Sequence, residues 1–133
     1  MQLLRAREAA MEKFRPMLRQ HGLTEQQWRV LRVLAAKERL DAGELADRSF
    51  LLGPSLSRIL QALVSDKLIK RTTDPKDQRR SIICLTPAGR SRFKKVGPDA
   101  EALYQSIEQK FGKQKLAELY KLLSELTQTI NEQ

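Results

Sequence analysis

The chain has 133 residues, 41% of them hydrophobic and 31% charged, which is typical of one folded domain with helical extensions and excludes global disorder. Its 25 lysines and arginines against 16 acids give a formal net charge of +9, and this excess indicates a polyanionic partner: DNA, RNA or an acidic membrane surface. A single cysteine excludes an intramolecular disulfide framework and a cysteine-rich zinc site.

Membrane insertion and secretion are not expected. No apolar run approaches the roughly 18 residues that span a membrane. The initial run MQLLRAREAAMEKF contains acids and lacks the uninterrupted apolar core of a signal peptide. We therefore expect a cytoplasmic protein with no membrane partner.

Two helices are predicted at the start of the chain. The first covers residues 1–20, where apolar residues recur at helical spacing. Gly22 suits the left-handed cap that ends such a helix. Thr24, with Gln27 three residues further on, is a capping-box pattern that opens the second helix, which should end near Lys37.

The next stretch predicts a helix-turn-helix. A short helix should run from Asp41, an N-cap residue, to about Arg48, and a second from Pro54 to about Lys67. One face of the second helix is apolar and consists of Leu56, Ile59, Leu60, Leu63 and Val64. The other face carries Pro54, Ser57, Arg58, Gln61 and Ser65, with Ser55 at its edge. Such side chains suit close approach to phosphates and base edges, although an ordinary solvated face has the same pattern.

A basic hairpin is predicted after these helices. Residues 68–73 and 79–85 have β-type composition and flank a polar tip at residues 74–78. Residues 39–40 are short enough to add a third strand. Helix, turn, helix and hairpin together make a winged helix-turn-helix, which places one helix in a DNA groove and the hairpin beside it.

Two helices with long apolar stripes are predicted beyond Thr86, which is an N-cap residue followed by Pro87. The first stripe has near coiled-coil spacing and consists of Gly89, Phe93, Val96, Ala100, Leu103 and Ile107. After a break at Gly112, the second consists of Leu116, Leu119, Leu123, Leu126 and Ile130. Stripes of this kind at the ends of a small DNA-binding domain favour a homodimer over packing within one chain.

The most specific run is Asp74-Pro75-Lys76-Asp77-Gln78-Arg79-Arg80, followed by Leu85-Thr86-Pro87-Ala88-Gly89. It resembles the wing signature of the MarR family (multiple antibiotic resistance regulators) of bacterial transcription factors, with Asp-x-Arg at the tip and Leu-Thr-x-x-Gly after the last strand. The resemblance covers essentially the whole chain, since residues 23–28, Glu44-Leu45-Ala46 and Ser57-Arg58 also match. The runs FRPMLRQHGLTEQQWRVLRVL and GPSLSRIL resemble the branch that represses homoprotocatechuate (4-hydroxyphenylacetate) catabolism.

The resemblance implies a mainly α (α+β) fold and a triangular homodimer. The expected order is helix, helix, strand, helix, helix, strand, strand, helix, helix. Residues 1–133 would form a single domain, with a winged lobe at 24–86 and a dimerisation region at 1–22 and 87–133. The implied partner is double-stranded DNA with a pseudo-palindromic operator.

The resemblance also implies which residues contact DNA. Arg79 is expected to enter the minor groove, where a guanidinium meets enhanced negative potential. Asp77 either orients Arg79 and the wing backbone or only forms the turn, and Arg58 is the best candidate to read a base. The full expected set is Ser55, Ser57, Arg58, Gln61, Lys70, Arg71, Lys76, Asp77, Arg79 and Arg80.

The branch resemblance implies an aromatic-acid effector such as 3,4-dihydroxyphenylacetate or 4-hydroxyphenylacetate. A site for it needs a cation for the carboxylate and an apolar or aromatic wall. Arg15, His21 and Trp28 stand near the junction of the first two helices and could supply these. Each also has a purely structural alternative: Arg15 as a surface arginine, His21 as a helix terminator and Trp28 as a core residue.

No enzyme, metal or cofactor is indicated. The sequence has no glycine-rich phosphate loop, HExxH helix or nucleophile elbow, and His21 is its only histidine. Cys84 is expected to be structural, with oxidant sensing as the alternative. The leading hypothesis is a ligand-responsive dimeric repressor of an aromatic-acid catabolic operon. A MarR-type repressor with another phenolic effector, and a non-catalytic winged-helix interaction module, remain as alternatives.

Overall fold

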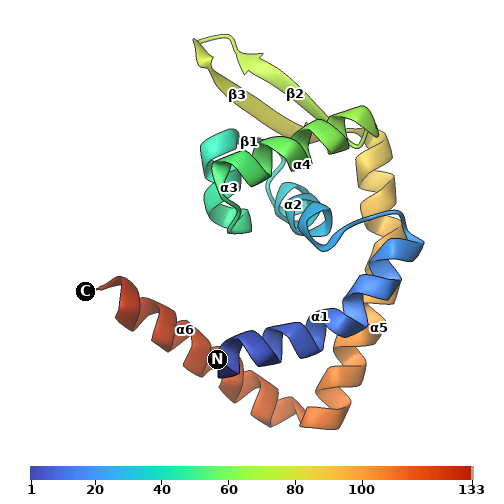
Figure 1. Ribbon diagram of the computed structural model, residues 1–133, viewed down its shortest axis with the longest axis vertical. Coiled ribbons are helices and arrows are strands. Elements are labelled where there is room, and N and C mark those ends of the chain that lie inside the picture. Colours follow the sequence, from blue (N-terminus) through green and yellow to red (C-terminus); the bar gives the residue numbers. More distant parts are fainter. Residues whose placement is uncertain (133) are drawn as a thin grey trace. The chain divides into compact units, whose positions relative to one another are not determined.

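The structure is a computed structural model that describes residues 1–132. It divides into two compact units, Met1–Asp99 and the residues from Ala100 onward. The helices are α1 (Gln2–Gln20), α2 (Glu25–Ala36), α3 (Ala42–Ser49), α4 (Gly53–Ser65), α5 (Pro87–Phe111) and α6 (Lys113–Asn131). The strands are β1 (Leu40–Asp41), β2 (Ile69–Asp74) and β3 (Asp77–Leu85), and all elements follow the expected order (Figure 1).

The predicted capping box at Thr24 forms, and the predicted N-cap residue Asp41 forms a second capping box with Glu44. Thr24 accepts a hydrogen bond from the Gln27 N–H at 3.1 Å, and the Gln27 side chain accepts from the Thr24 N–H at 3.0 Å. At α3, Asp41 accepts from the Glu44 N–H at 2.8 Å, so this aspartate caps the first helix of the helix-turn-helix. These reciprocal bonds satisfy backbone donors that the first turn leaves unpaired.

The core of the first unit joins α1–α4, the sheet and the first half of α5. Its fully buried members are Leu18, Val30, Leu31, Leu34, Leu45, Leu60, Leu63, Ile83 and Val96. Val64 does not belong to it, contrary to the predicted apolar face of the second helix, because 42% of its surface is exposed. Leu56, Leu60 and Leu63 already form the buried line, and Val64 lies at its rim.

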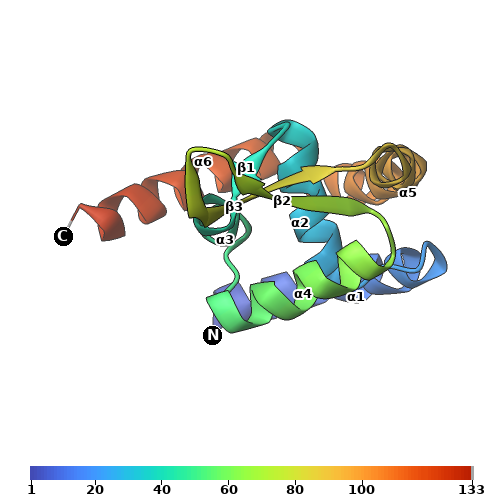
Figure 2. The same cartoon turned by 90° about the horizontal axis from the view of Figure 1, so that it is seen from above.

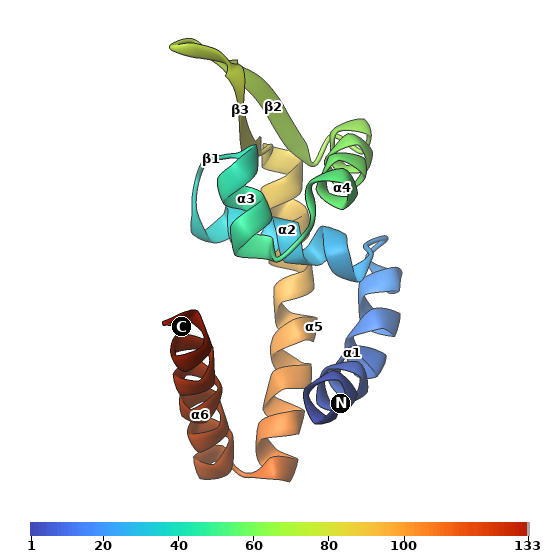
Figure 3. The ribbon, with the colours of Figure 1, turned by 60° about the vertical axis from the view of Figure 1, so that its left-hand side comes forward.

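The sheet is antiparallel with strand order β1-β3-β2. In β1, Leu40 pairs with Ile83. The hairpin pairs regularly from Ile69 with Leu85 to Thr73 with Ser81, and its tip projects beyond α3 and α4 (Figure 3). The tip is tighter than predicted, because the strands extend to Asp74 and Asp77 and leave two residues between them. The third strand is likewise displaced by one residue from 39–40.

One corner joins α4, β2 and α5. The Thr86 hydroxyl donates to the Lys67 carbonyl at 2.7 Å and accepts from the Gly89 N–H at 3.0 Å, while the Thr86 N–H donates to the Leu68 carbonyl at 3.1 Å. A Cβ on Gly89 would lie 1.9 Å from the Leu68 carbonyl oxygen. Gly89 is therefore a close-contact residue of the winged lobe rather than part of a dimerisation stripe. At the same corner Lys67 adopts the left-handed φ of 62°, so α4 ends before it, at Ser65.

The second unit contains the end of α5 and all of α6, separated by Gly112 at φ +107°. None of the α6 residues described is buried. The exposed large apolar residues of α6 are Leu119, Tyr120, Leu122, Leu126 and Ile130. Across residues 1–132, no helix combines the length and apolarity needed to cross a bilayer.

Candidate DNA-binding surface and effector site

Helix α4, the expected recognition helix, lies beside β2 (Figure 2). Ser57, Arg58 and Gln61 are exposed and Ser55 is half-buried, whereas Leu60 and Leu63 on the opposite side are in the core. The helix begins at Gly53, one residue earlier than predicted, and its N-cap position is occupied by Leu52 with no side-chain cap. Three of the four expected α4 contacts, Ser57, Arg58 and Gln61, are therefore accessible, and Ser55 is partly so.

The wing tip is shaped by two aspartates. Asp74 accepts a hydrogen bond from the Lys76 N–H at 2.9 Å, and Asp77 accepts from the Arg79 N–H at 3.0 Å. The Arg79 guanidinium also lies 3.5 Å from Asp77. Asp77 therefore combines the two roles left open by the sequence, since it forms the turn and also contacts the tip arginine.

A bulge directs the tip arginine, Arg79, outward. Thr73 pairs with Ser81 and Asp74 with Asp77, so residues 78–80 of β3 have no cross-strand partner. A bulge of this kind bends the strand and re-aims its side chains. The Arg79 side chain is 93% exposed and Lys76 is exposed beside it.

Lys70 and Arg71 are both exposed on β2. Because successive residues of a strand point to opposite faces, these two side chains leave opposite sides of the hairpin. Lys70 stands opposite Cys84 on β3, and the Cys84 thiol is half-buried and not in a disulfide. The two cations therefore cannot both contact a phosphate from the same face of the wing.

Arg80 differs from the other expected DNA contacts, because its guanidinium is bonded to three carboxylates. It lies 2.9 Å from Asp41, 3.2 Å from Glu44 and 3.3 Å from Asp74. The hydrogen bond to Asp41, followed by its charge, raises the pKa of Arg80 above its usual range. Arg80 thus joins the wing to the start of α3.

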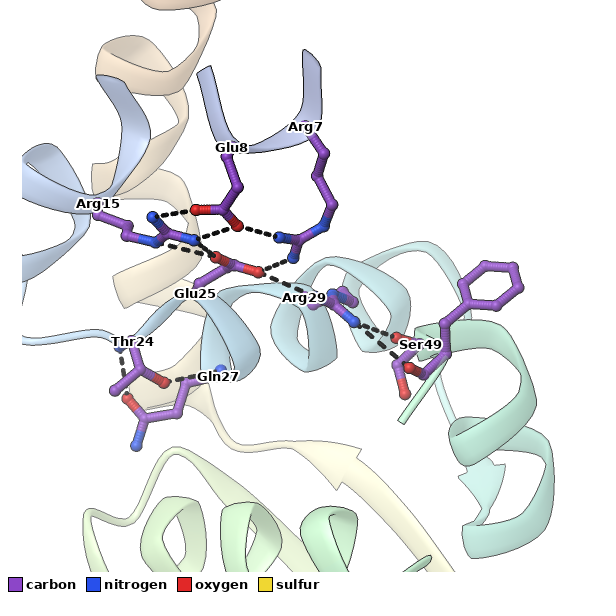
Figure 4. A network of polar contacts seen from close by, with 9 residues as sticks. Arg7, Glu8, Arg15, Thr24, Glu25, Gln27, Arg29 and Ser49 are labelled. Atoms are coloured by element: carbon purple, nitrogen blue, oxygen red, sulfur yellow. Dashed lines mark hydrogen bonds and ion pairs between the residues drawn. The ribbon is translucent and has the colours of Figure 1, made fainter. Parts of the chain in front are cut away.

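A half-buried glutamate is the centre of a charge network at the α1–α2 junction (Figure 4). The Glu25 side chain is only 9% exposed and pairs with Arg7, with Arg15 at 3.0 Å and with Arg29 at 3.0 Å. Glu8 accepts two further hydrogen bonds from Arg15, each of 3.1 Å. The sequence interpretation missed Arg7, Glu8, Glu25 and Arg29, although Glu25 and Arg29 have the spacing of a helical ion pair.

The arginines keep both carboxylates charged. Burial acts to raise the pKa of Glu25, but hydrogen bonds from Arg7 and Arg15 and their positive charges outweigh it, so this pKa lies below its ordinary value. The pKa of Glu8 is lowered mainly by the hydrogen bond from Arg15. The network therefore holds three cations and two anions in a partly enclosed space.

Trp28 lies on the same helix, three residues after Glu25. Its side chain is buried and stacks on Phe93, with ring centroids 5.2 Å apart. The indole Nε1 is the one buried side-chain polar atom, among the residues described, that has no hydrogen-bond partner. Since an unpaired buried donor is costly, this N–H is a candidate hydrogen-bond donor to a water or a ligand.

A cavity at the start of α2 is lined by one of the three expected effector residues, Arg15. This cavity of about 270 Å³ is lined by Arg15, Arg19, Leu23, Thr24, Glu25 and Gln26, and neither His21 nor Trp28 contributes to it. His21 Nε2 lies 2.7 Å from Asp99, and its carbonyl accepts from Arg92 at 2.9 Å. His21 therefore joins the α1 terminus to α5, which is a structural role.

An exposed recognition helix followed by a basic, bulged wing defines a winged-helix DNA-binding protein. The sequence model of the MarR family matches residues 21–80. The chain is 42% identical, over 92% of its length and 83% of the relative's, to the homoprotocatechuate degradative operon repressor of Escherichia coli. It therefore belongs to the MarR family, whose members bind DNA as dimers and respond to small ligands.

Two solved structures support this assignment. The transcriptional regulator PA4135 superposes with a TM-score of 0.92 at 46% identity, covering 96% of this chain and 93% of that one. NadR in complex with 4-hydroxyphenylacetate superposes with a TM-score of 0.81 at 40% identity, covering 93% of this chain and 88% of that one. The predicted family and fold are confirmed, and the relatives are transcriptional regulators, not enzymes.

Proposed function

We propose that this chain is a homodimeric repressor that binds a pseudo-palindromic operator and leaves it when a small aromatic acid binds. The first candidates for the acid are 4-hydroxyphenylacetate and 3,4-dihydroxyphenylacetate. Support comes from the 42% identity to a repressor of a homoprotocatechuate operon and the 40% identity to NadR, which binds 4-hydroxyphenylacetate. We assign this function to the cytoplasm, where bacterial DNA lies.

The polar edge of α4 is proposed to enter the major groove. Arg58 is the bidentate base reader, and Ser57 and Gln61 contact bases or phosphates next to it. Ser55 lies near the helix start, where phosphate contacts are favourable. Their exposure on one side of a helix whose other side is buried supports this orientation.

The wing is proposed to contact the minor groove through Arg79 and the flanking phosphates through Lys76 and either Lys70 or Arg71. A guanidinium that is 93% exposed on a bulge is available for groove insertion without losing a strong partner, because surface ion pairs such as Asp77–Arg79 contribute little. For Arg80 we propose a different role: it holds the wing at the start of α3.

The observation that carries the effector proposal is the unpartnered N–H of Trp28, which follows Glu25 by three residues on α2. Residues three apart on a helix lie on the same side, so one ligand can reach both. We propose that the ligand carboxylate accepts from Trp28 and Arg15 and that a phenol hydroxyl donates to Glu25. The Trp28–Phe93 stack offers an aromatic wall.

The apolar residues of α6 are proposed to pack against a second copy of the chain. Leu126 and Ile130 are 45% and 58% exposed. Burying such residues contributes roughly 25 cal/mol per Å² of apolar surface. A two-fold dimer would place two recognition helices about one DNA turn apart, ~34 Å.

Fluorescence anisotropy on a DNA fragment from upstream of the gene tests the proposal. The wild-type protein should bind with an affinity that falls steeply with salt, because phosphate neutralisation releases counterions. Adding 4-hydroxyphenylacetate should weaken binding, whereas phenylacetate, which lacks the hydroxyl, should act less. Arg15→Ala should blunt the response while basal DNA binding survives. Failure of both hydroxylated acids to bind at millimolar concentration in calorimetry would refute the effector assignment and leave DNA binding standing.

A further inference from the structure

Arg29 forms a bridge between two distant parts of the first unit (Figure 4). Its Nη2 donates to Glu25 Oε2 at 3.0 Å, on the same helix. Its Nη1 donates to the backbone carbonyls of Ser49 and Phe50, at 3.1 and 3.4 Å. One half-buried guanidinium therefore links the α1–α2 charge network to the end of α3.

The end of α3 depends on this contact. The last carbonyls of a helix have no partner within it, and Arg29 satisfies two of them here. Phe50 adopts the left-handed conformation, with φ 56° and ψ 44°, which costs a non-glycine residue roughly 1–2 kcal/mol. An external hydrogen bond is therefore one of the forces that hold the chain in this turn.

The turn in question leads directly into the recognition helix. Only residues 50–52 separate α3 from α4. Leu52, at the N-cap, provides no side-chain hydrogen bond to the first turn of α4. With no cap of its own, the start of α4 takes its position from the turn and from packing, so a change at the Ser49 and Phe50 carbonyls is transmitted to the DNA-binding edge.

At the other end of the bridge, Glu25 is shared among three guanidiniums. Arg7 and Arg15 come from α1 and Arg29 from α2. A ligand hydroxyl that donates to Glu25 adds a hydrogen bond to this carboxylate and changes how it divides its hydrogen bonds. The hydrogen bond from Arg29 Nη2 to Glu25 then changes, while Arg29 Nη1 still donates to the Ser49 and Phe50 carbonyls.

From this geometry we infer that Arg29 is a positioning residue that couples the occupancy of the α1–α2 junction to the placement of the recognition helix. The identity of the effector rests on the proposed function, whereas the coupling between Glu25 and α4 does not. In the ligand-free protein, the Glu25–Arg29–Ser49 chain holds α4 in the operator-binding position. Effector binding weakens this chain and releases the operator.

A ligand-free double-mutant cycle tests the coupling directly. Operator affinity is measured for wild type, Glu25→Gln, Arg29→Gln and the double variant. Each single change should weaken binding roughly three- to thirty-fold, and the double variant should bind no more weakly than Arg29→Gln alone. Arg90→Gln removes the same charge from an exposed residue that has no ion pair within residues 1–132. It is the matched control and should change binding less than two-fold.

The cycle separates coupling from a merely structural role. If Arg29 only stabilises the fold, Glu25→Gln and Arg29→Gln should lower the melting temperature and their effects on operator affinity should multiply. That result, or a Glu25→Gln variant with wild-type operator affinity, overturns the inference. Arg29→Lys keeps the charge, but an ammonium group cannot reach both carbonyls and Glu25 as the planar guanidinium does. Its operator affinity should therefore lie between those of wild type and Arg29→Gln.

The ligand arm uses 4-hydroxyphenylacetate with the full-length protein. Arg29→Gln should bind the acid within about three-fold of wild type in calorimetry, yet the acid should no longer change its operator affinity. If the acid lowers the operator affinity of Arg29→Gln by the same factor as that of the wild type, the inference is overturned. If the wild type itself does not bind the acid, the proposed effector is wrong, and the ligand-free cycle still decides the role of Arg29.

Discussion

Arg80 and Asp41 are 39 residues apart in the sequence, yet Arg80 Nε lies 2.9 Å from Asp41 Oδ2. The same carboxylate accepts the Glu44 N–H that caps α3. This backbone hydrogen bond, followed by the one from Arg80, lowers the pKa of Asp41. One aspartate therefore both starts the first helix of the helix-turn-helix and anchors the wing.

Arg80→Gln should weaken operator binding by roughly 0.5–2 kcal/mol through loss of the wing's position rather than loss of a phosphate contact. The measurement is operator affinity as a function of salt. A phosphate contact contributes about one unit to the slope of log affinity against log salt. Arg80→Gln should leave the slope nearly unchanged, whereas Lys76→Gln should reduce it by about one. An equal reduction for both would assign Arg80 to phosphate binding.

Arg79→Ala should weaken operator binding by roughly 1–3 kcal/mol while the thermal melting temperature and the dimer stay unchanged. The side chain is 93% exposed, so its removal costs the fold little. Because the expected contact is in the minor groove, the loss should be larger on operators with A·T base pairs under the wing than on G·C variants. Unchanged affinity at fixed salt would remove Arg79 from the DNA interface.

Gly89→Ala should destabilise the protein by roughly 2–4 kcal/mol, because the new Cβ would meet the Leu68 carbonyl, a backbone atom that cannot move aside alone. Gly43→Ala in α3 is the matched control, because the nearest atom to its added Cβ is Asp41 Oδ1 at 3.5 Å, which is an ordinary contact. It should be neutral or stabilise by about 0.5–1 kcal/mol through helix propensity. Urea unfolding measures the free energy of unfolding of both variants. Equal values would show that the backbone around Leu68 moves to accommodate the new Cβ.

The predictable parts of the fold were those set by local chemistry. The capping residues Thr24 and Asp41, the break at Gly112 and the wing signature each depend on neighbours within a few positions, and each forms as expected. The hairpin register was less predictable, because several turn-forming residues lie between 74 and 78. The bulge at residues 78–80, which the turn composition does not specify, decides where the strands end.

The candidate site was predicted less completely, because its electrostatics depend on distant pairs. The exposed cations on α4 and the wing are predicted by the charge pattern of the sequence. The residues next to Arg80 and Arg29 do not indicate that Arg80 binds Asp41 or that Arg29 reaches the Ser49 carbonyl. The sequence indicates Arg15 as a possible cation for the effector, but its local pattern does not indicate the two carboxylates that pair with Arg15. Partners 7 to 39 residues apart are known only once the helices pack.

Acid should destabilise the fold partly through Glu25. Its pKa is lowered in the folded chain, so the unfolded state binds more protons as the pH falls. The resulting stability is complete above the ordinary carboxyl range, about pH 4, and is lost as the pH falls through the folded pKa. Glu25→Gln should therefore show a smaller decline in unfolding free energy between pH 7 and pH 3 than wild type. The control is Glu12→Gln, at an exposed position of α1, whose unfolding free energy should decline over this pH range as much as that of wild type.

A chain that ends at residue 115 should be monomeric or aggregated and should lose most specific operator affinity. It lacks Leu119, Leu126 and Ile130, which are 40–58% exposed within one chain and are proposed to be buried by a second copy. Two half-sites are bound together only when a dimer joins the recognition helices, so a monomer forfeits the second contact. Analytical ultracentrifugation and operator titration measure the two effects.

Full-length variants distinguish loss of the interface from misfolding of the truncated chain. Leu126→Asp places a charge in the proposed interface and should dissociate the dimer while the melting of the winged lobe persists. Lys121→Asp changes an exposed position of the same helix and should leave the dimer intact. A stable dimer from both Leu126→Asp and the chain ending at residue 115 would show that the protomers associate through another surface.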